Sequence, residues 1–476
     1  MAKRWARAAD GERVILALAL AAVSAVGPQG IADHGTSPGT LEPRPASGQV
    51  SPLQRRIDDA ASGATVEVAA GTYTGDLEID RPITLIGHGR PLLVGSGVGS
   101  VIRVRADDVV IDGFDVDGRN GGDLGRDSSG IHVAGRRATI RDCYVRRSLF
   151  GVYLREAHGT RVVRCRINGI PGRDPGEKGS GIHAWNTEGF RLEQNVIVEA
   201  RDGIYLQSSS KGHIGGNQVR DVRYGLHYMF SDDNLFEDNV FENGAAGTAI
   251  MYSRRIVFRR NRFLHNRGFA SVGLLFQGCD DVIAEDNLIA DNARGIFLEG
   301  SRRDVFRRNI VAQSDIAIVL FASCADVRFE GNSFVGNMTP LSLVGKRTDT
   351  TFDGNYWSDN DEPDLDGDGR SDRPFRLSSV FDHLRGNLIA ADLIAQSFAA
   401  TALGLAERAF PVLEAVSPED RSPLVRPPSL PAVPPARQDR SAGDVRGIAI
   451  AVAVAGAGGV VLTKGARVAR RKGARP

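Results

Sequence analysis

Residues 195–216 read NVIVEARDGIYLQSSSKGHIGG, and residues 217–238 read NQVRDVRYGLHYMFSDDNLFED. The two stretches have equal length, and each opens on an asparagine followed by short runs in which apolar and polar residues alternate. Alternation with a period of two indicates strands, and neither stretch has the periodicity of a helix. A unit repeated about every 22 residues predicts a solenoid built of short strands.

The opening asparagine recurs along the middle of the chain, at Asn195, Asn217, Asn239, Asn261, Asn287, Asn309, Asn332 and Asn355. Leucine-rich repeats share this period, but their spaced leucines are missing here. We therefore predict an all-β fold, a right-handed parallel β-helix over 63–357, with roughly thirteen coils that each rise about 4.8 Å. We expect the asparagines to stack in the turns, where each side-chain amide would hydrogen-bond to its neighbour one coil away. Such turns need a residue that tolerates left-handed φ, as asparagine does.

Charge and cysteine content exclude several classes of protein. The chain has 476 residues with 59 basic and 58 acidic side chains, so its net charge of +1 gives no electrostatic case for nucleic acid. Four cysteines without a CxxC pair exclude a multi-cysteine zinc or iron–sulfur framework. Cys143 and Cys165 hold the asparagine position upstream, one coil apart. A disulfide and a pair of inward thiols both fit that spacing.

The two ends have the composition of targeting segments. Basic residues followed by an apolar run predict a secretory signal peptide over 1–32, and a linker or cap follows over 33–62. Residues 447–463 carry no charge and precede a basic stretch over 464–476, which predicts a membrane anchor with a cytoplasmic tail. The alternative is a segment that lies on the membrane surface. Between body and anchor we expect an acidic Asp/Gly turn region (358–386), a helical segment (387–413) and a proline-rich linker (414–446).

Alignment of the coils on their glycines assigns side chains to the two faces of one sheet. Positions one and three after the glycine are mostly apolar and face the core, so positions two and four face outward. The outward positions carry rings instead of lysine and glutamate, at His132, Tyr153, His183, Trp185 and Tyr205. An exposed aromatic stripe is typical of a partner surface. The alternative is that a flanking loop or the helical segment covers it.

Met229 and Met251 occupy the same outward position on adjacent coils, so their Cα atoms should lie about 4.8 Å apart. His227 shares their face, two residues before Met229. Two thioethers and an imidazole suit Cu(I) and are poor ligands for Mg²⁺ or Ca²⁺. The hypothesis is a Cu(I) site at these three residues, and the alternative is that the methionines only pack.

A second candidate metal site follows the β-helix. Asp364, Asp366, Asp368 and Asp372 stand at positions 1, 3, 5 and 9 of a loop with glycine at position 6, the spacing of a calcium loop. Position 12 is Phe375 and not a glutamate, so the loop is not an EF-hand. We expect a calcium-stabilised turn, with a plain acidic turn as the alternative.

Many extracellular β-helices cleave polysaccharides, which makes a carbohydrate-binding or carbohydrate-cleaving protein the alternative function. Such chemistry needs paired carboxylates on one face. The outward positions contain one acid, Glu299, and no pair on neighbouring coils. We therefore expect that the chain is not an enzyme.

Several stretches resemble the NosD family, the periplasmic β-helical accessory proteins of nitrous oxide reductase maturation. They are RYGLHYMFSDDN at 223–234, IMYS at 250–253, GLLFQGC at 273–279 and NYWSD at 355–359. The order and spacing match from GTY at 71–73 to AERAFP at 406–411.

The resemblance implies a non-catalytic partner of an ABC-type permease and ATPase. With a membrane-associated copper chaperone, it would supply the copper–sulfur centre of apo nitrous oxide reductase. On this chain the family motif contains His227, Met229 and Met251, so the copper contacts that the resemblance implies are the same three residues that the spacing indicates. The C-terminal apolar segment departs from the family pattern of soluble proteins held by their permease, and here it would anchor the protein directly.

Overall fold

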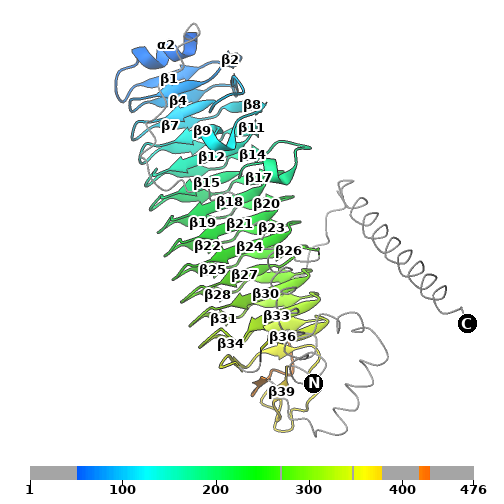
Figure 1. The fold of residues 1–476 in the computed structure, drawn as a ribbon. Coiled ribbons are helices and arrows are strands. Elements are labelled where there is room, and N and C mark those ends of the chain that lie inside the picture. Colours follow the sequence, from blue (N-terminus) through cyan, green and yellow to red (C-terminus); the bar gives the residue numbers. More distant parts are fainter. Residues whose placement is uncertain (1–50, 269–270, 346–347, 378–417, 429–476) are drawn as a thin grey trace, which may run out of the picture. The chain divides into compact units, whose positions relative to one another are not determined.

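The computed structural model describes residues 51–268, 271–345, 348–377 and 418–428. Within these ranges three long sheets run side by side, and the chain visits each sheet once per coil (Figure 1). Every pairing between consecutive coils from β1 to β38 is parallel, with a register shift where β8 pairs with β11, so the predicted parallel β-helix is confirmed. The signal peptide (1–32), the helical segment (387–413), the anchor (447–463) and the basic tail (464–476) lie outside these ranges. Among the described helices, none has the length and apolar content to cross a bilayer.

The strands are short, mostly three to six residues. Sheet A contains β1 (Thr65–Val68), β4 (Thr84–Gly87), β7 (Val110–Asp112), β10 (Thr139–Arg141), β13 (Arg161–Val163), β16 (Arg191–Glu193), β19 (His213–Gly215), β22 (Leu235–Glu237), β25 (Val257–Arg259), β28 (Ile283–Glu285), β31 (Val305–Arg307), β34 (Arg328–Glu330), β37 (Thr351–Asp353), β40 (Glu419–Asp420) and β39 (Phe375–Arg376). Sheet B contains β2 (Thr72–Thr74), β5 (Leu92–Val94), β8 (Asp115–Gly121), β11 (Tyr144–Ser148), β14 (Arg166–Asn168), β17 (Val196–Val198), β20 (Gln218–Arg220), β23 (Val240–Glu242), β26 (Arg262–Leu264), β29 (Leu288–Ala290), β32 (Ile310–Ala312), β35 (Ser333–Val335) and β38 (Tyr356–Trp357). Sheet C contains β3 (Leu77–Ile79), β6 (Ile102–Val104), β9 (Ser129–Val133), β12 (Phe150–Arg155), β15 (Ile182–Trp185), β18 (Asp202–Gln207), β21 (Tyr224–Met229), β24 (Ala246–Met251), β27 (Leu274–Gln277), β30 (Arg294–Glu299), β33 (Ile316–Phe321) and β36 (Thr339–Val344).

The core is a set of side-chain columns that run through the middle of the coils. Phe236 stacks on Phe258 with ring centroids 4.6 Å apart, and Phe306 stacks on Phe329 at 4.8 Å. All four rings are fully buried. Burial of a phenylalanine contributes about 1.5–3 kcal/mol, so these columns hold successive coils in register.

The asparagine column forms the predicted ladder inside the turns. The backbone N–H and Nδ2 of Asn217 both donate to Oδ1 of Asn239, at 3.0 and 2.9 Å, and the same pattern continues to Asn355. The left-handed backbone lies one residue earlier, as at Gln194 and Asp238, and not at the asparagine as expected. Asparagine is required because one buried amide satisfies donors of the coil before it and an acceptor of the coil after it.

Asp420 ends this ladder. Its carboxylate accepts hydrogen bonds from the backbone and Nδ2 of Asn355, at 3.0 and 2.8 Å, and from Nε1 of Trp357 at 3.1 Å. Its strand, β40, pairs with β37 as one more rung of sheet A. The prediction of a linker over 414–446 is therefore wrong for residues 418–428. Buried amide donors at the end of a ladder need an acceptor, and the returning chain supplies it.

At the other end a short helix, α2 (Pro52–Asp59), closes the β-helix, within the segment expected to form a cap. Ser51 accepts a hydrogen bond from the backbone of Gln54 and starts the helix. The amide of Gln54 then pairs with both the N–H and the C=O of Glu78, at 2.8 Å each, which satisfies part of the open edge of β3.

Cys143 and Cys165 are buried thiols on adjacent rungs above Asn195. Their sulfurs lie within hydrogen-bond reach of the carbonyl oxygens of Arg141 (3.2 Å) and Val163 (3.5 Å). The pair therefore extends the ladder as free thiols, one of the two arrangements that fitted their spacing.

Candidate functional site

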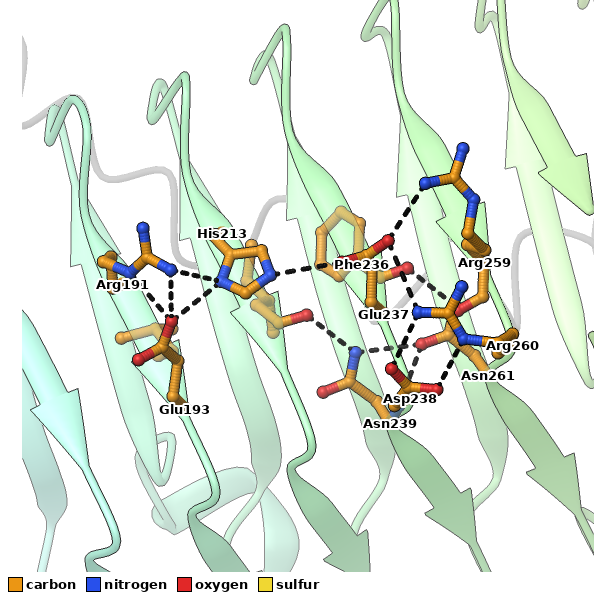
Figure 2. A network of polar contacts seen from close by, with 12 residues as sticks. Arg191, Glu193, His213, Phe236, Glu237, Asp238, Asn239, Arg259, Arg260 and Asn261 are labelled. Carbon is orange, nitrogen blue, oxygen red and sulfur yellow. Dashed lines mark hydrogen bonds and ion pairs between the residues drawn. The ribbon is translucent and has the colours of Figure 1, made fainter.

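The outer faces of the sheets differ in chemistry. Sheet A carries charged residues that pair across coils (Figure 2). Its His213 lies between Glu193, at 2.9 Å, and Glu237, at 3.5 Å. Arg260 pairs with Asp238 at 2.9 Å. Such solvated, mutually paired charges are typical of a soluble surface.

Sheet C carries a column of alternating histidine and tyrosine rings on its outer side. In register these are His132, Tyr153, His183, Tyr205 and His227. The ring centroids are 5.3, 4.5, 4.5 and 4.6 Å apart along the column. These are distances for direct ring contact, so the five side chains form one continuous ring ladder.

The expected exposure of this ladder is wrong for its first three members. His132, Tyr153 and His183 are buried, whereas Trp185 and Tyr205 are half-buried. Phe150 packs edge-on against the rings of Tyr153 and His183, at 5.3 and 5.4 Å. Longer coils at this level insert the short 3-10 helices η1 (Leu124–Arg126) and η2 (Pro175–Glu177). These insertions interrupt the 22-residue repeat, so the burial of the three rings could not be predicted from the repeat period.

Burial fixes the charge state of the covered histidines. It lowers the pKa of His132 to about 3, with the charge of Arg103 as a second cause. It lowers the pKa of His183 to about 3, with Arg201 as a second cause. Within the described chain, neither nitrogen of His183 has a hydrogen-bond partner, nor has Nε2 of His132. Both imidazoles are therefore neutral at physiological pH.

The candidate copper ligands lie at the open end of the ladder. Met229 and Met251 are register partners on β21 and β24, as their spacing predicts. The hydroxyl of Tyr205 lies 3.8 Å from the sulfur of Met229. Met251 packs against the apolar cluster that includes Ala249 and Leu275. The fold therefore brings the three sequence-predicted residues to one face of two adjacent coils.

Asp202 fixes the orientation of His227, and the sequence analysis missed it. Its carboxylate is fully buried and lies 3.1 Å from Nδ1 of His227. Arg223 donates to both carboxylate oxygens at 2.8 Å. Burial alone would raise the pKa of Asp202, but the hydrogen bonds and charges of His227 and Arg223 hold that pKa well below its usual range. An ionised carboxylate only accepts, so Nδ1 of His227 donates to Asp202, which leaves Nε2 as the ring nitrogen for a metal ion.

This donor set suits a soft, singly charged ion. Both oxygens of Asp202 are occupied, and Arg201 and Arg223 supply positive charge beside it. A hard divalent cation would find no free carboxylate here. Two thioethers and an imidazole, by contrast, are ligands that Cu(I) prefers.

The acidic loop brings together three of its four predicted ligands. Oxygen atoms of Asp364, Asp366 and Asp372 lie within 4.8 Å of one another, and Asp368 is not part of that group. Both oxygens of Asp364 already accept from backbone N–H groups, of Gly367 at 2.7 Å and of Gly369 at 3.0 Å. The loop is thus preformed by its own hydrogen bonds.

The outward acid Glu299 is half-buried and accepts a hydrogen bond from Gln277 at 3.2 Å. Burial raises its pKa. Its register neighbour on β27 is Gln277, so the described part of this column offers no second carboxylate for acid–base chemistry.

Comparisons with known proteins identify the family. A sequence model described as "Periplasmic copper-binding protein (NosD)" matches residues 165–362. A protein of Stutzerimonas stutzeri named "Probable ABC transporter binding protein NosD" is 30% identical over 377 residues, which cover 76% of this chain and 86% of that protein. The chain belongs to the NosD family. A NosD protein of Pseudomonas aeruginosa with the same name is 29% identical over 379 residues, covering 76% of this chain and 88% of that protein.

Among solved structures, the A-module of a mannuronan C-5 epimerase of Azotobacter vinelandii is similar, with a TM-score of 0.56. It is 16% identical, and the match covers 64% of this chain and 93% of that chain. At that identity the likeness concerns the β-helix fold alone. The segment matched by the NosD model, by contrast, contains His227, Met229 and Met251.

Proposed function

We propose that this NosD protein is a copper-handling accessory protein that holds Cu(I) at His227, Met229 and Met251 outside the cytoplasm. The observation that carries the proposal is the register pairing of the two methionines beside an imidazole oriented by a buried carboxylate. The family description supports copper and a periplasmic location. The names of the relatives support an ABC transporter as partner.

The finer role follows from the family resemblance. The protein would receive Cu(I) from a membrane-associated copper chaperone and work with the permease and ATPase of an ABC transporter. The copper would serve the copper–sulfur centre of apo nitrous oxide reductase. The protein itself catalyses no reaction in this role. Its site releases copper without breaking a thiolate bond, because thioether sulfurs are neutral donors.

The experiment is an anaerobic Cu(I) titration of the full chain against a competing chelator. We expect one tight site, weakened at least about 100-fold in the Met229→Ala/Met251→Ala double variant, beyond the usual cost of losing an outer-shell contact. The matched control is Met338→Ala, which removes a thioether that is 58% exposed and outside the site. Equal binding by wild type and double variant would refute the site.

The same protein preparations also distinguish the copper proposal from the alternative function, carbohydrate binding. A carbohydrate-binding protein would bind acidic oligosaccharides at Trp185 and Tyr205 and show no Cu(I) site. Trp185→Ala and Tyr205→Ala would then abolish saccharide binding. In the copper proposal, Trp185→Ala leaves the Cu(I) affinity unchanged, because Trp185 contributes no ligand.

A further inference from the structure

Phe230 and Tyr252 are two aromatic side chains that the fold leaves in solvent. They are 54% and 51% exposed, and their rings stack with centroids 5.5 Å apart and planes at 15°. Each directly follows one of the two methionines in the sequence. The same two coils therefore carry the thioether pair and the exposed ring pair.

The backbone at these positions does not favour large side chains. Phe230 has φ 50° and Tyr252 has φ 52°, in the left-handed region. The equivalent turn in the preceding coil has Ser208 at φ 50°, and the turns of the next two coils have Gly278 and Gly300 at φ +62°. A bulky residue in left-handed backbone is rare and costs free energy. The turn alone therefore gives no reason for two aromatic residues.

The surroundings keep the ring pair apolar and open. A Cβ atom on Gly278 would lie 2.9 Å from Cδ1 of Tyr252, so glycine at that turn leaves the space that the ring occupies. The charges next to the pair neutralise one another: Arg254 lies 3.6 Å from Asp232, and Arg255 lies 2.6 Å from Asp233. The two rings therefore form a small apolar patch, and the paired charges around it make a neutral rim.

We infer that Phe230 and Tyr252 form the docking surface for the protein that exchanges Cu(I) with Met229 and Met251. This rests on the proposed copper function. Direct exchange requires a ligand of the partner to bind the same ion, so the partner's surface must cover the turns that follow the two methionines. The partner is a copper protein whose own sulfur ligands lie in an apolar surface, because the neutral rim offers no net charge for recognition.

The test uses the full chain and the Phe230→Ser/Tyr252→Ser double variant. Serine is chosen because Ser208 adopts the same backbone at the same turn. The control is Leu365→Ser, which removes an exposed apolar side chain elsewhere (79% exposed). The Cu(I) donors are two short peptides that hold the ion through two methionines, one flanked by leucines and the other by serines.

Wild type and control should take Cu(I) from the leucine-flanked peptide about tenfold faster than from the serine-flanked one, the effect of one interface anchor. In the double variant this difference should disappear while the equilibrium Cu(I) affinity stays unchanged, and added salt should have little effect. A double variant that keeps the preference would overturn the docking surface alone. Sedimentation with anionic lipid vesicles that requires the two rings would also overturn it. Wild type without Cu(I) affinity would refute the copper function itself.

Discussion

Replacing His183 by phenylalanine should remove part of the acid sensitivity of this NosD protein. The imidazole lies between the rings of Tyr153 and Tyr205, 4.5 Å from each. Within the described structure its two nitrogens have no hydrogen-bond partner. A buried imidazole in such a place resists protonation, whereas the same group in the unfolded chain does not.

The direction and the size of this pH effect on stability follow from the pKa of His183 in the folded and in the unfolded protein. Burial, aided by the charge of Arg201, lowers the pKa of His183 from 6.5 to about 3 in the folded protein. Well above pH 6.5 the group is neutral in both states and contributes no pH dependence. As the pH falls from 6.5 towards about 3, only the unfolded chain takes up the proton, so stability is lost. At about pH 5 the loss is about 2 kcal/mol for each such histidine.

The assay is urea unfolding of wild type and His183→Phe at about pH 7.5 and about pH 5. Between these conditions wild type should lose about 2 kcal/mol more stability than the variant. A steric effect of the larger ring would shift the variant equally at both pH values, so the difference between the two conditions isolates the titration. His88→Phe is the control, because the His88 side chain is 60% exposed. Equal acid sensitivity of wild type and His183→Phe would refute the reasoning.

Three further changes test other parts of the structure. Asn261→Ala removes a ladder amide that accepts two hydrogen bonds and donates to three oxygens, and it should cost about 3–5 kcal/mol in urea unfolding. No loss would show that the ladder is not a source of stability. Gly212→Ala would place a Cβ atom 2.3 Å from the buried ring of Phe190 and should cost about 1–3 kcal/mol, whereas Gly99→Ala, with no atom within 4 Å, should be nearly neutral. Millimolar Ca²⁺, but not Mg²⁺, should raise the melting temperature by a few degrees and do so less in Asp366→Asn. An equal response of that variant would leave the acidic loop a plain turn.

The sequence predicted the architecture because the repeat period determines which residues stack. Equal 22-residue steps place Met229 beside Met251 and Asn217 beside Asn239, and both pairs are register or hydrogen-bond partners in the structure. The period also assigned the ring ladder to the outer side of one sheet. These features depend only on counting residues along a regular coil.

Features that depend on breaks in the period could not be predicted in this way. His183 is buried against Phe150 at the level where insertions lengthen the coils, and the cap at Asp420 comes from a chain segment 65 residues beyond Asn355. The sequence contained only a weak indication of the role of Asp202. It is an acidic residue directly before the glycine of its coil, whereas the same position in the next coil is Tyr224. Its role became visible only when the structure showed both oxygens paired and the carboxylate fully buried.

The separation of charge between the two sheets supports the copper role proposed for sheet C. On sheet A the outward carboxylates and guanidiniums pair across coils and leave a hydrated surface, which would favour hard cations or none. On sheet C the outward column holds aromatic rings, imidazoles and thioethers, and the buried carboxylate of Asp202 beside His227 is paired with Arg223. Coil spacing sets the distance between the methionine backbones, while their flexible side chains can follow a soft ion. In the proposed role, a fixed backbone with mobile thioether ligands on an open face would hold Cu(I) and still present it to a second set of ligands. Such a site would be better suited to the transfer of Cu(I) than to its storage.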